Sequence, residues 1–217
     1  MLAFARKEPS ATLLAAQMAA ILLYPFMEGN EVGRALFSVF GIAILVLVLF
    51  AVRSMGFTWV VLILGVPAST LLLIQAITRD DRLLPYSSGL EAVIYLYAAS
   101  TLIRYMLADH AVTRDELFAV GATFTLVAWG FAYSYVVCQA IYPGSFTAAV
   151  TPEGDRTWME LLFMSFTTLT GTGMGDVIPI RPFARALVMV EQVAGLAYVA
   201  IVVSRLVGLT VMRRPRG

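Results

Sequence analysis

A segment rich in alternating glycines carries the residue types that can replace water around a cation. From position 165 to position 176 the sequence reads SFTTLTGTGMGD, with Gly171, Gly173 and Gly175 at every second position. A strand whose backbone carbonyl oxygens face one axis supplies rings of oxygens when several subunits surround that axis. Such a strand needs alternate residues in the left-handed region, which glycine reaches without steric penalty. The carboxylate of Asp176 would then lie at one mouth of the site.

The residues before the glycines predict a short helix that points at the same site. The apolar run Trp158–Leu169 has 12 residues, whereas a span needs about 20 to cross ~30 Å of hydrocarbon. The partly negative C-terminal end of such a helix favours a cation. Two interpretations stay open: a re-entrant helix and loop whose backbone groups are received by protein or water, or an extracellular loop with a buried amphipathic turn. We expect Glu160 to cap or brace the loop rather than contact ions.

The composition places these elements in a membrane. The chain has 217 residues, of which 60% are hydrophobic and 13% charged, and its mean hydropathy is +0.84. Soluble domains carry roughly 25% charged residues, so an ordinary soluble globule and a disordered chain are excluded. A net charge of +1 gives no basic field for nucleic acid. The single cysteine, Cys138, and the single histidine, His110, argue against a disulfide framework and a Cys- or His-ligated metal site.

Six long apolar runs predict an all-α, polytopic membrane fold with six transmembrane helices. With both termini inside, nine basic residues fall on the inner side and six on the outer side, in line with the excess of Lys and Arg in cytoplasmic loops. The runs cover 11–27, 35–52, 58–77, 89–108, 117–142 and 182–209. The inner basic residues are Arg6, Lys7, Arg53, Arg104, Arg114, Arg205, Arg213, Arg214 and Arg216, and the outer ones are Arg34, Arg79, Arg82, Arg156, Arg181 and Arg185.

Around the glycines the sequence resembles the potassium channel pore-loop family. In that family a pore helix leads into Thr-Thr-Val-Gly-Tyr-Gly-Asp and then into a long inner helix. Here Thr168-Leu169-Thr170 leads in, and Gly173, Gly175 and Asp176 match the Gly-x-Gly-Asp core. The resemblance covers about 117–208, including Pro179 in the loop to the inner helix and residues 185–187 and 204–208, which look like the inner-helix ends of small bacterial channels of this class.

The resemblance implies a fold, a location and a set of partners. It implies six transmembrane helices plus a re-entrant pore helix and filter loop, with an N-terminal four-helix domain at 1–110 and a pore domain at 111–217. The fourth run has one basic residue, Arg104, so the N-terminal domain is not expected to sense voltage. We expect a homotetramer in contact with membrane lipids of a bacterial inner (plasma) membrane, with cytoplasmic termini. Neither nucleic acid nor a soluble partner is implied.

The expected activity is passive, tetrameric monovalent cation conduction, chiefly of potassium, and no enzyme activity. No cofactor is expected apart from the permeant K⁺ or another monovalent cation, which would be bound at the filter alone. The implied ion-binding residues are Thr170 at the inner end, Gly171, Thr172, Gly173, Met174 and Gly175, with Asp176 at the outer mouth.

Three residues depart from the family pattern and weaken the case for strict potassium selectivity. Gly171 replaces the threonine whose hydroxyl helps form the innermost site, Thr172 replaces valine, and Met174 replaces the tyrosine behind the filter. Glycine adds backbone freedom and methionine is flexible, so both changes should loosen the filter. A non-selective cation channel with the same pore is therefore the first alternative.

Two residues of the last apolar run are candidates for gating or for lining the cavity. Gly195 lies near the middle of the run, where it provides either a hinge or close helix packing. Glu191 lies one turn earlier. Because a carboxylate inside a span is costly, it faces either a water-filled cavity or a bonding partner on a neighbouring helix.

Other classes of membrane protein fit the sequence less well. A secondary transporter would show matching broken helices in two halves; Pro67 could break the third run, but no corresponding half is visible. An intramembrane serine protease needs a histidine on another span, and His110 lies instead in a charged loop.

Overall fold

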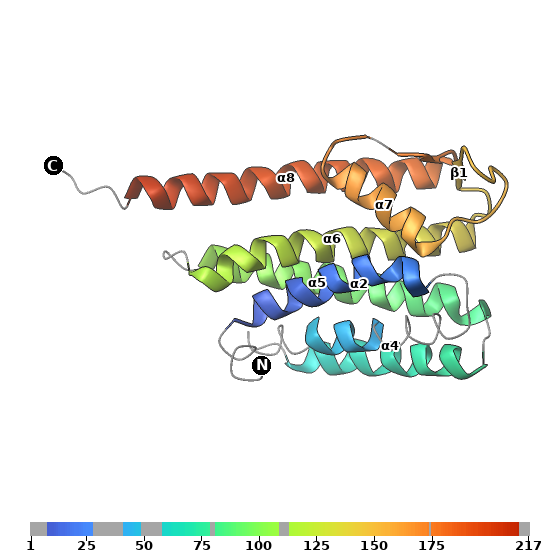
Figure 1. Ribbon diagram of the computed structural model, residues 1–217, viewed down its shortest axis with the longest axis horizontal. Helices are drawn as coiled ribbons and strands as arrows, with labels where there is room; N and C mark the ends of the chain where they lie inside the picture. The colour runs from blue at the N-terminus through green and yellow to red at the C-terminus, as the bar shows by residue number, and fades with distance from the viewer. Residues whose placement is uncertain are drawn as a thin grey trace.

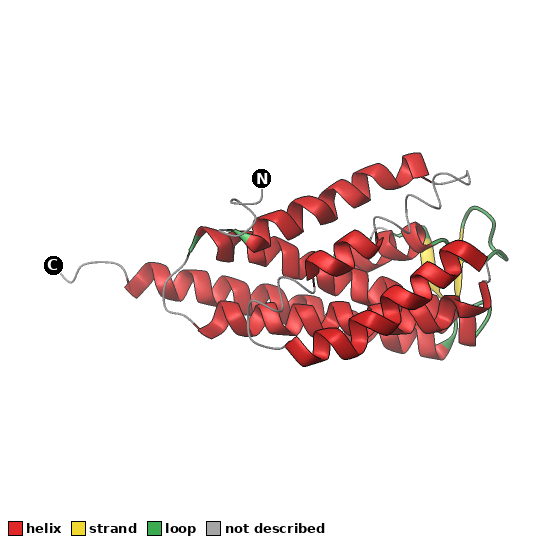
Figure 2. Ribbon diagram, turned by 90° about the horizontal axis from the view of Figure 1, so that it is seen from below, coloured by secondary structure: helices red, strands yellow, loops and turns green. Residues whose placement is uncertain are grey.

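The protein is a bundle of helices that run close to one common direction (Figures 1 and 2). The structure, a computed structural model, describes residues 8–27, 41–48, 58–78, 81–108, 113–173 and 175–212. The elements in chain order are α2 (Pro9–Met27), α4 (Thr58–Thr78), η1 (Asp81–Leu83), α5 (Leu84–Ala108), α6 (Arg114–Ile141), β1 (Phe146–Ala148), α7 (Trp158–Leu169), β2 (Val177–Pro179) and α8 (Pro182–Met212).

Four of the described helices are long and apolar enough to cross a membrane: Pro9–Phe26, Leu84–Ala108, Arg114–Ile141 and Pro182–Arg205. In α4 the apolar stretch found is shorter, Ile63–Gln75. The predicted second run lies outside the described residues except for 41–48, which are helical. The described chain is therefore a mostly helical, multi-pass membrane protein, and the six-span count stays a prediction. The proposed domain boundary at 110 and 111 also lies outside the described residues.

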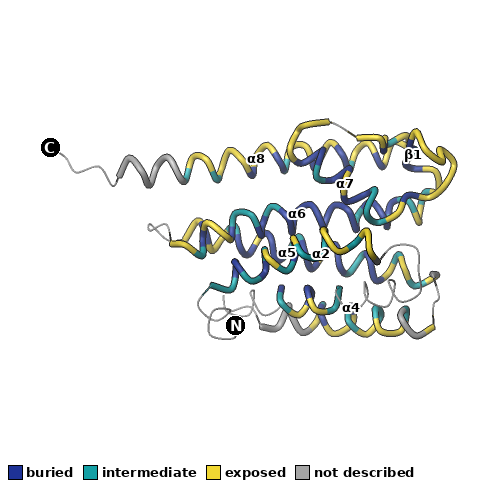
Figure 3. Tube along the Cα trace, viewed as in Figure 1, coloured by how far each residue is buried: buried dark blue, intermediate teal, exposed yellow. Residues whose placement is uncertain are grey.

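The core lies between α5 and α6, which form the most extensive helix pair. Tyr95 of α5 is fully buried, with its ring edge-on to Trp129 and stacked on Tyr133, both of α6, at centroid separations of 5.6 Å. Such aromatic pairs add about 0.5–1.5 kcal/mol each to the gain from burial. Figure 3 shows that burial is concentrated along α5 and α6. α7 and α8 pack against α6 and against each other.

Helix ends differ from the apolar runs because polar caps add residues. α6 begins at Arg114 rather than at Leu117, since Thr113 and Glu116 form a reciprocal capping box. The Glu116 amide donates to the Thr113 hydroxyl at 3.2 Å, and the Thr113 amide donates to the Glu116 carboxylate at 3.3 Å. The first charged turn of α6 therefore belongs to the helix.

α8 is the most exposed of the long helices, although it is strongly apolar. It spans 31 residues and lies along one side of the bundle, opposite α4, with its C-terminal part extending past the other helices (Figure 1). Leu196 is 76% exposed and Val193 is 70% exposed. A single chain thus leaves one apolar side of α8 uncovered.

Candidate functional site

The candidate segment is held in a loop that leaves and rejoins the bundle at one end. β1 and β2 pair antiparallel, with Phe146 opposite Pro179 and Ala148 opposite Val177, and both strands lie at the same end of the bundle (Figure 2). The Ile180 amide donates to the Ser145 carbonyl at 2.8 Å and extends this closure. The strands were not predicted from the sequence. Their pairing holds together the two ends of the segment that contains α7 and the glycines.

α7 has the bounds that the sequence predicted, and a second capping box explains where it begins. Thr157 is the N-cap, and the Glu160 carboxylate accepts the Thr157 amide at 2.6 Å while the Thr157 hydroxyl accepts the Glu160 amide at 3.3 Å. Glu160 also pairs with Arg156 at 3.3 Å. In the structure Glu160 therefore caps α7 and contacts the preceding loop, away from the glycines.

Arg156 organises the loop before α7, a role that the sequence did not reveal. The residue is 4% exposed, and its side chain donates to the carbonyl oxygens of Val150, Thr151 and Gly154. Its backbone is tied to Gln139 of α6, whose side chain accepts the Arg156 amide at 2.8 Å and donates to the Arg156 carbonyl at 3.0 Å. The buried guanidinium thus holds the loop together, and the Arg156 backbone fastens it to α6 just before α7 begins.

The first residue of α7 packs into an aromatic cluster shared by three helices. The Trp158 ring lies 5.7 Å from Tyr24 of α2, and 5.5 Å from Trp129 and 5.6 Å from Tyr133, both of α6. Distances between 4.5 and 7 Å are those of favourable ring contacts. The short helix is therefore positioned by α2 and α6 together.

The backbone after α7 folds onto the end of that helix. Gly171 has φ 71° and Gly173 has φ 64°, the left-handed conformation expected for the alternating glycines, whereas Gly175 does not have a positive φ. Their amides donate to the last carbonyls of α7, from Gly171 to Thr168 at 3.1 Å and from Gly173 to Thr167 at 3.2 Å. The amides of this segment are thus directed back to the protein.

Three carbonyl oxygens of the same segment stay available, whereas that of Gly173 accepts the Gly175 amide at 3.1 Å. Among the described residues, no hydrogen bond is accepted by the carbonyl oxygens of Thr170, Gly171 or Thr172. All described residues from 170 to 176 are exposed in the single chain, and Met174 lies outside the described residues. Asp176 follows directly, also exposed. The arrangement presents backbone oxygens and one carboxylate to the outside of the subunit.

Glu191 lies on α8 and is buried between α6 and α7. It is completely buried, and its two carboxyl oxygens bond to different helices, one to the hydroxyl of Tyr135 on α6 and the other to that of Ser165 on α7. The Ser165 hydroxyl also lies 2.8 Å from the carbonyl oxygen of Ala128. The sequence left two positions open for this carboxyl group, a water-filled cavity or a bond to a neighbouring helix. In the structure it is bonded to two neighbouring helices.

Gly195 is the point at which α8 touches the end of α7. A Cβ atom at this position would lie 2.2 Å from the carbonyl oxygen of Leu169 and 3.0 Å from its Cα. Only glycine permits this approach without displacement. In this structure the residue serves close helix packing, directly behind the start of the glycine segment.

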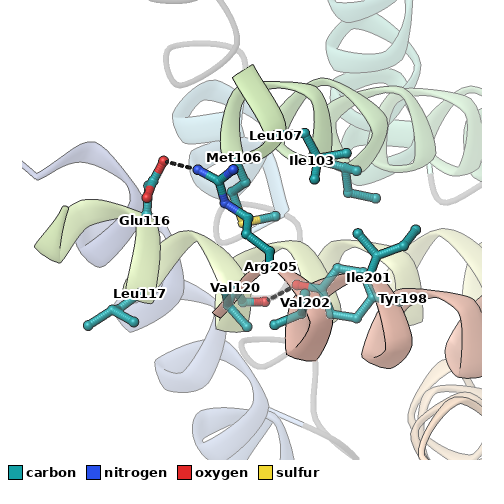
Figure 4. Close-up of a pocket in the computed structure, with 10 residues that line it drawn as sticks. All are labelled: Ile103, Met106, Leu107, Glu116, Leu117, Val120, Tyr198, Ile201, Val202 and Arg205. Atoms are coloured by element: carbon teal, nitrogen blue, oxygen red, sulfur yellow. Dashed lines mark hydrogen bonds and ion pairs between the residues drawn. The ribbon is translucent and has the colours of Figure 1, made fainter. Parts of the chain in front are cut away.

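The other half of α8 is held to α6 by two polar contacts beside a small cavity. Arg205 pairs with Glu116 at 3.0 Å, and the Tyr198 hydroxyl donates to the Val120 carbonyl at 2.6 Å (Figure 4). The cavity, of about 20 Å³, is completed by side chains of α5, among them Met106. Glu116 thus caps α6 and binds α8 at once, a partnership across 89 positions that the sequence gives no sign of.

The comparisons with known proteins bear on this half of the molecule. A family model described as "Ion channel" matches residues 120–211, the stretch from the first turns of α6 to the last turn of α8. Neither a curated protein nor a solved structure matches the chain.

Proposed function

We propose, from the match of residues 120–211 to the family model described as "Ion channel", that the chain is one subunit of a homotetrameric monovalent cation channel that conducts mainly potassium. The exposed segment 170–176 would meet its symmetry copies around one axis. α7 would be a re-entrant pore helix, α6 the outer helix and α8 the inner helix. The permeant ion would be the only bound species, and conduction would be passive.

One observation carries this proposal: at the start of the glycine segment the amides are bonded to α7 while three successive carbonyl oxygens are left without a donor among the described residues. The amides of Gly171 and Gly173 are bonded to the end of α7, while the carbonyl oxygens of Thr170 to Thr172 accept nothing from the described chain. Unpaired backbone oxygens inside a membrane protein are tolerated where they line a water-filled or ion-filled path. Rings of such oxygens can replace the hydration shell of an ion.

The surface of α8 favours assembly around that path. Val193 and Leu196 are largely exposed, and an apolar helix face in the pore half can be covered by neighbouring subunits or lipid. One glycine segment supplies a quarter of a ring in a tetramer. We propose that both termini lie in the cytoplasm of a bacterial cell with six spans per subunit, which places Asp176 at the outer mouth, where it would attract cations.

A non-selective cation pore is the second candidate, favoured by the composition of the segment. Gly171 stands where the family has threonine, and Met174 stands where it has tyrosine. Without the hydroxyl and with a flexible thioether behind the backbone, ring size is held less firmly. The measured ratio of potassium to sodium permeability separates the two candidates.

The test is cation flux into liposomes that contain the purified protein, under opposed potassium and sodium gradients. Gly173→Ala forces a side chain into a left-handed position, at a cost of roughly 1–2 kcal/mol. Gly144→Ala is a matched control: Gly144 has φ 72°, and at both glycines an added Cβ would have no neighbouring atom within 4 Å. Gly144 lies between α6 and β1, outside the glycine segment.

We expect Gly173→Ala to abolish or strongly reduce cation flux, and Gly144→Ala to leave it near the wild-type rate. Equal flux in wild type and Gly173→Ala would show that this segment is not the conduction path. Equal losses in both variants would point to a general folding defect and would also contradict a specific role for Gly173. Wild-type protein that carries no cation at all would refute the proposed function.

A further inference from the structure

The carboxyl group of Glu191 is buried in the span without a charged partner. Its exposure is 0%, and neither ion pair formed by the described residues includes it. Its titratable neighbours are the Tyr135 hydroxyl, which it contacts, and the Cys138 thiol beside that tyrosine. A bare carboxylate in apolar surroundings is costly unless a cation or several donors compensate it.

The hydrogen atoms available around Glu191 decide its protonation state. A serine hydroxyl has one hydrogen to donate, yet the Ser165 oxygen lies within hydrogen-bonding distance of both the Ala128 carbonyl oxygen and a Glu191 carboxyl oxygen. If Glu191 were ionised, both neighbours would be acceptors and one contact would lack a hydrogen. A proton on Glu191 supplies it: the acid donates to Ser165, Ser165 donates to Ala128, and Tyr135 donates to the second carboxyl oxygen.

We propose that Glu191 acts as a neutral carboxylic acid that bonds α8 to α7 and α6 and so positions the glycine segment. Its effect on permeation rests on the proposed channel function, whereas its protonation and bonding do not. Glu191 is a positioning residue, because it contacts Ser165 rather than the exposed carbonyl oxygens.

The contact at Gly195 gives this bond a direct route to the segment. Ser165 and Leu169 lie one turn apart on α7, and Glu191 and Gly195 lie one turn apart on α8. Ser165 is hydrogen-bonded to Glu191, and Leu169 is in close backbone contact with Gly195. Two adjacent contacts resist sliding and rotation better than one. Loss of the Glu191 bond would therefore free the end of α7, whose last carbonyls hold the amides of Gly171 and Gly173.

The first experiment reads the proton directly and needs no ion flux. Infrared spectra of the reconstituted protein at neutral pH are compared between wild type and Glu191→Gln. We expect wild type to show the absorption of a protonated carboxyl group that Glu191→Gln lacks. If Glu191→Gln instead lost only the absorption of an ionised carboxylate, Glu191 would be charged in the wild type and the proposal would be overturned. Glu91→Gln, at another buried carboxyl group, 2% exposed on α5, identifies any contribution from that residue.

The second experiment reads positioning through the reversal potential under mixed potassium and sodium. The amide of Glu191→Gln can donate to Ser165 and accept from Tyr135, so it reproduces the neutral acid and should keep the wild-type value. Glu191→Ala leaves both hydroxyls unpaired and should lower potassium over sodium permeability several-fold. Tyr135→Phe, which removes one donor and keeps the side-chain volume, should cause a smaller shift in the same direction.

The matched control is Glu91→Ala, the same truncation at a buried carboxyl group of α5, which should leave the reversal potential unchanged. A Glu191→Gln variant with a shifted reversal potential would show that the charge is required and would overturn the neutral bond. Unchanged permeability ratios in both Glu191→Ala and Tyr135→Phe would overturn the positioning role. If wild type conducts no cation, the channel proposal fails while the infrared result still decides the state of Glu191.

Discussion

The two halves of α8 are held to the molecule in different ways. Near the glycine segment, Glu191 is fully buried between α6 and α7, and Gly195 lies in backbone contact with the end of α7. Toward the C-terminus, α8 is held by the Arg205–Glu116 ion pair and by the Tyr198 hydroxyl, beside a small cavity. One half is close-packed against α7, and the other is attached to α6 by two polar contacts.

The difference teaches which half of α8 can move at low cost. Close-packed contacts give way only when backbone or core side chains shift, which is expensive. An ion pair and one hydrogen bond near an unfilled space can be exchanged for water more easily. We expect substitutions in the half of α8 near the glycine segment to alter ion selectivity. Substitutions in the C-terminal half, here called the far half, should alter the open probability of the channel.

Gly195→Val should produce the largest effect. The added Cβ would lie 2.2 Å from the Leu169 carbonyl oxygen, so α7 and α8 must separate, at a cost of about 1–3 kcal/mol or more. We expect lower thermal stability and loss of cation flux from liposomes. The measurements are thermal unfolding of the purified protein and the flux assay.

Gly89→Ala on α5 is the control for a helix glycine. A Cβ there meets only Val137, at 3.9 Å, and alanine favours a helix by about 1 kcal/mol over glycine. This variant should be as stable as wild type or more so, with normal flux. If Gly195→Val kept full flux, a flexible hinge would describe Gly195 better than close packing does.

Gly171→Thr combined with Met174→Tyr should produce the next largest effect, a change in selectivity. Because Gly171 has φ 71°, a threonine there also carries a left-handed penalty of roughly 1–2 kcal/mol, so the total flux should fall while the selectivity of the remaining flux changes. Both substitutions restore the family residue types and should hold the ring of oxygens more firmly. We expect the reversal potential to move toward that of potassium under opposed potassium and sodium gradients. An unchanged reversal potential in the double variant would contradict the link between these two residues and a loose filter.

Local sequence signals predicted the short helix and part of the backbone conformation of the candidate segment. The bounds of α7 follow from a short apolar run behind a Thr-x-x-Glu capping box, and the left-handed backbone at Gly171 and Gly173 follows from their alternation. These features depend on neighbours within a few positions, so the sequence carries them directly. The same holds for the four spans identified in the described chain.

Contacts between distant positions could not be predicted in the same way. An acidic residue in a span signals that Glu191 needs a partner, but Tyr135 is 56 positions away and Ser165 is 26 positions away. Arg156 looked like one of several charges on an outer loop, and only the folded loop gathers its carbonyl acceptors. Partner choice depends on how helices pack, and no local pattern encodes it.

The Arg205–Glu116 pair leads to a prediction about the far half of α8, with a smaller expected effect that is confined to gating. We expect Arg205→Gln and Glu116→Gln each to change the open probability in single-channel recordings and to leave the reversal potential unchanged. Glutamine can still serve in the capping box that starts α6, so Glu116→Gln removes the charge but not the cap. The double variant should show a coupling free energy between about 0.5 and 3 kcal/mol.

The Arg156–Glu160 pair is the control, because it joins the same residue types across one helical turn in the loop before α7. The double-mutant cycle of Arg156→Gln and Glu160→Gln should show no coupling in the open probability. Coupling of equal size in both cycles would mean that gating is not localised to the far half of α8. A shift in reversal potential from Arg205→Gln would contradict the division between the two halves.

Tyr198→Phe should have the smallest effect. It removes one hydroxyl that donates to the Val120 carbonyl at 2.6 Å and leaves the ring packed in place, a loss of about 1 kcal/mol. Because Tyr198 lies only three positions beyond Gly195, it tests where the division between the two halves falls. A change in open probability alone would assign it to the far half, whereas a shifted reversal potential would extend the close-packed half by one turn. Tyr86→Phe, at a tyrosine 69% exposed on α5, should change neither quantity.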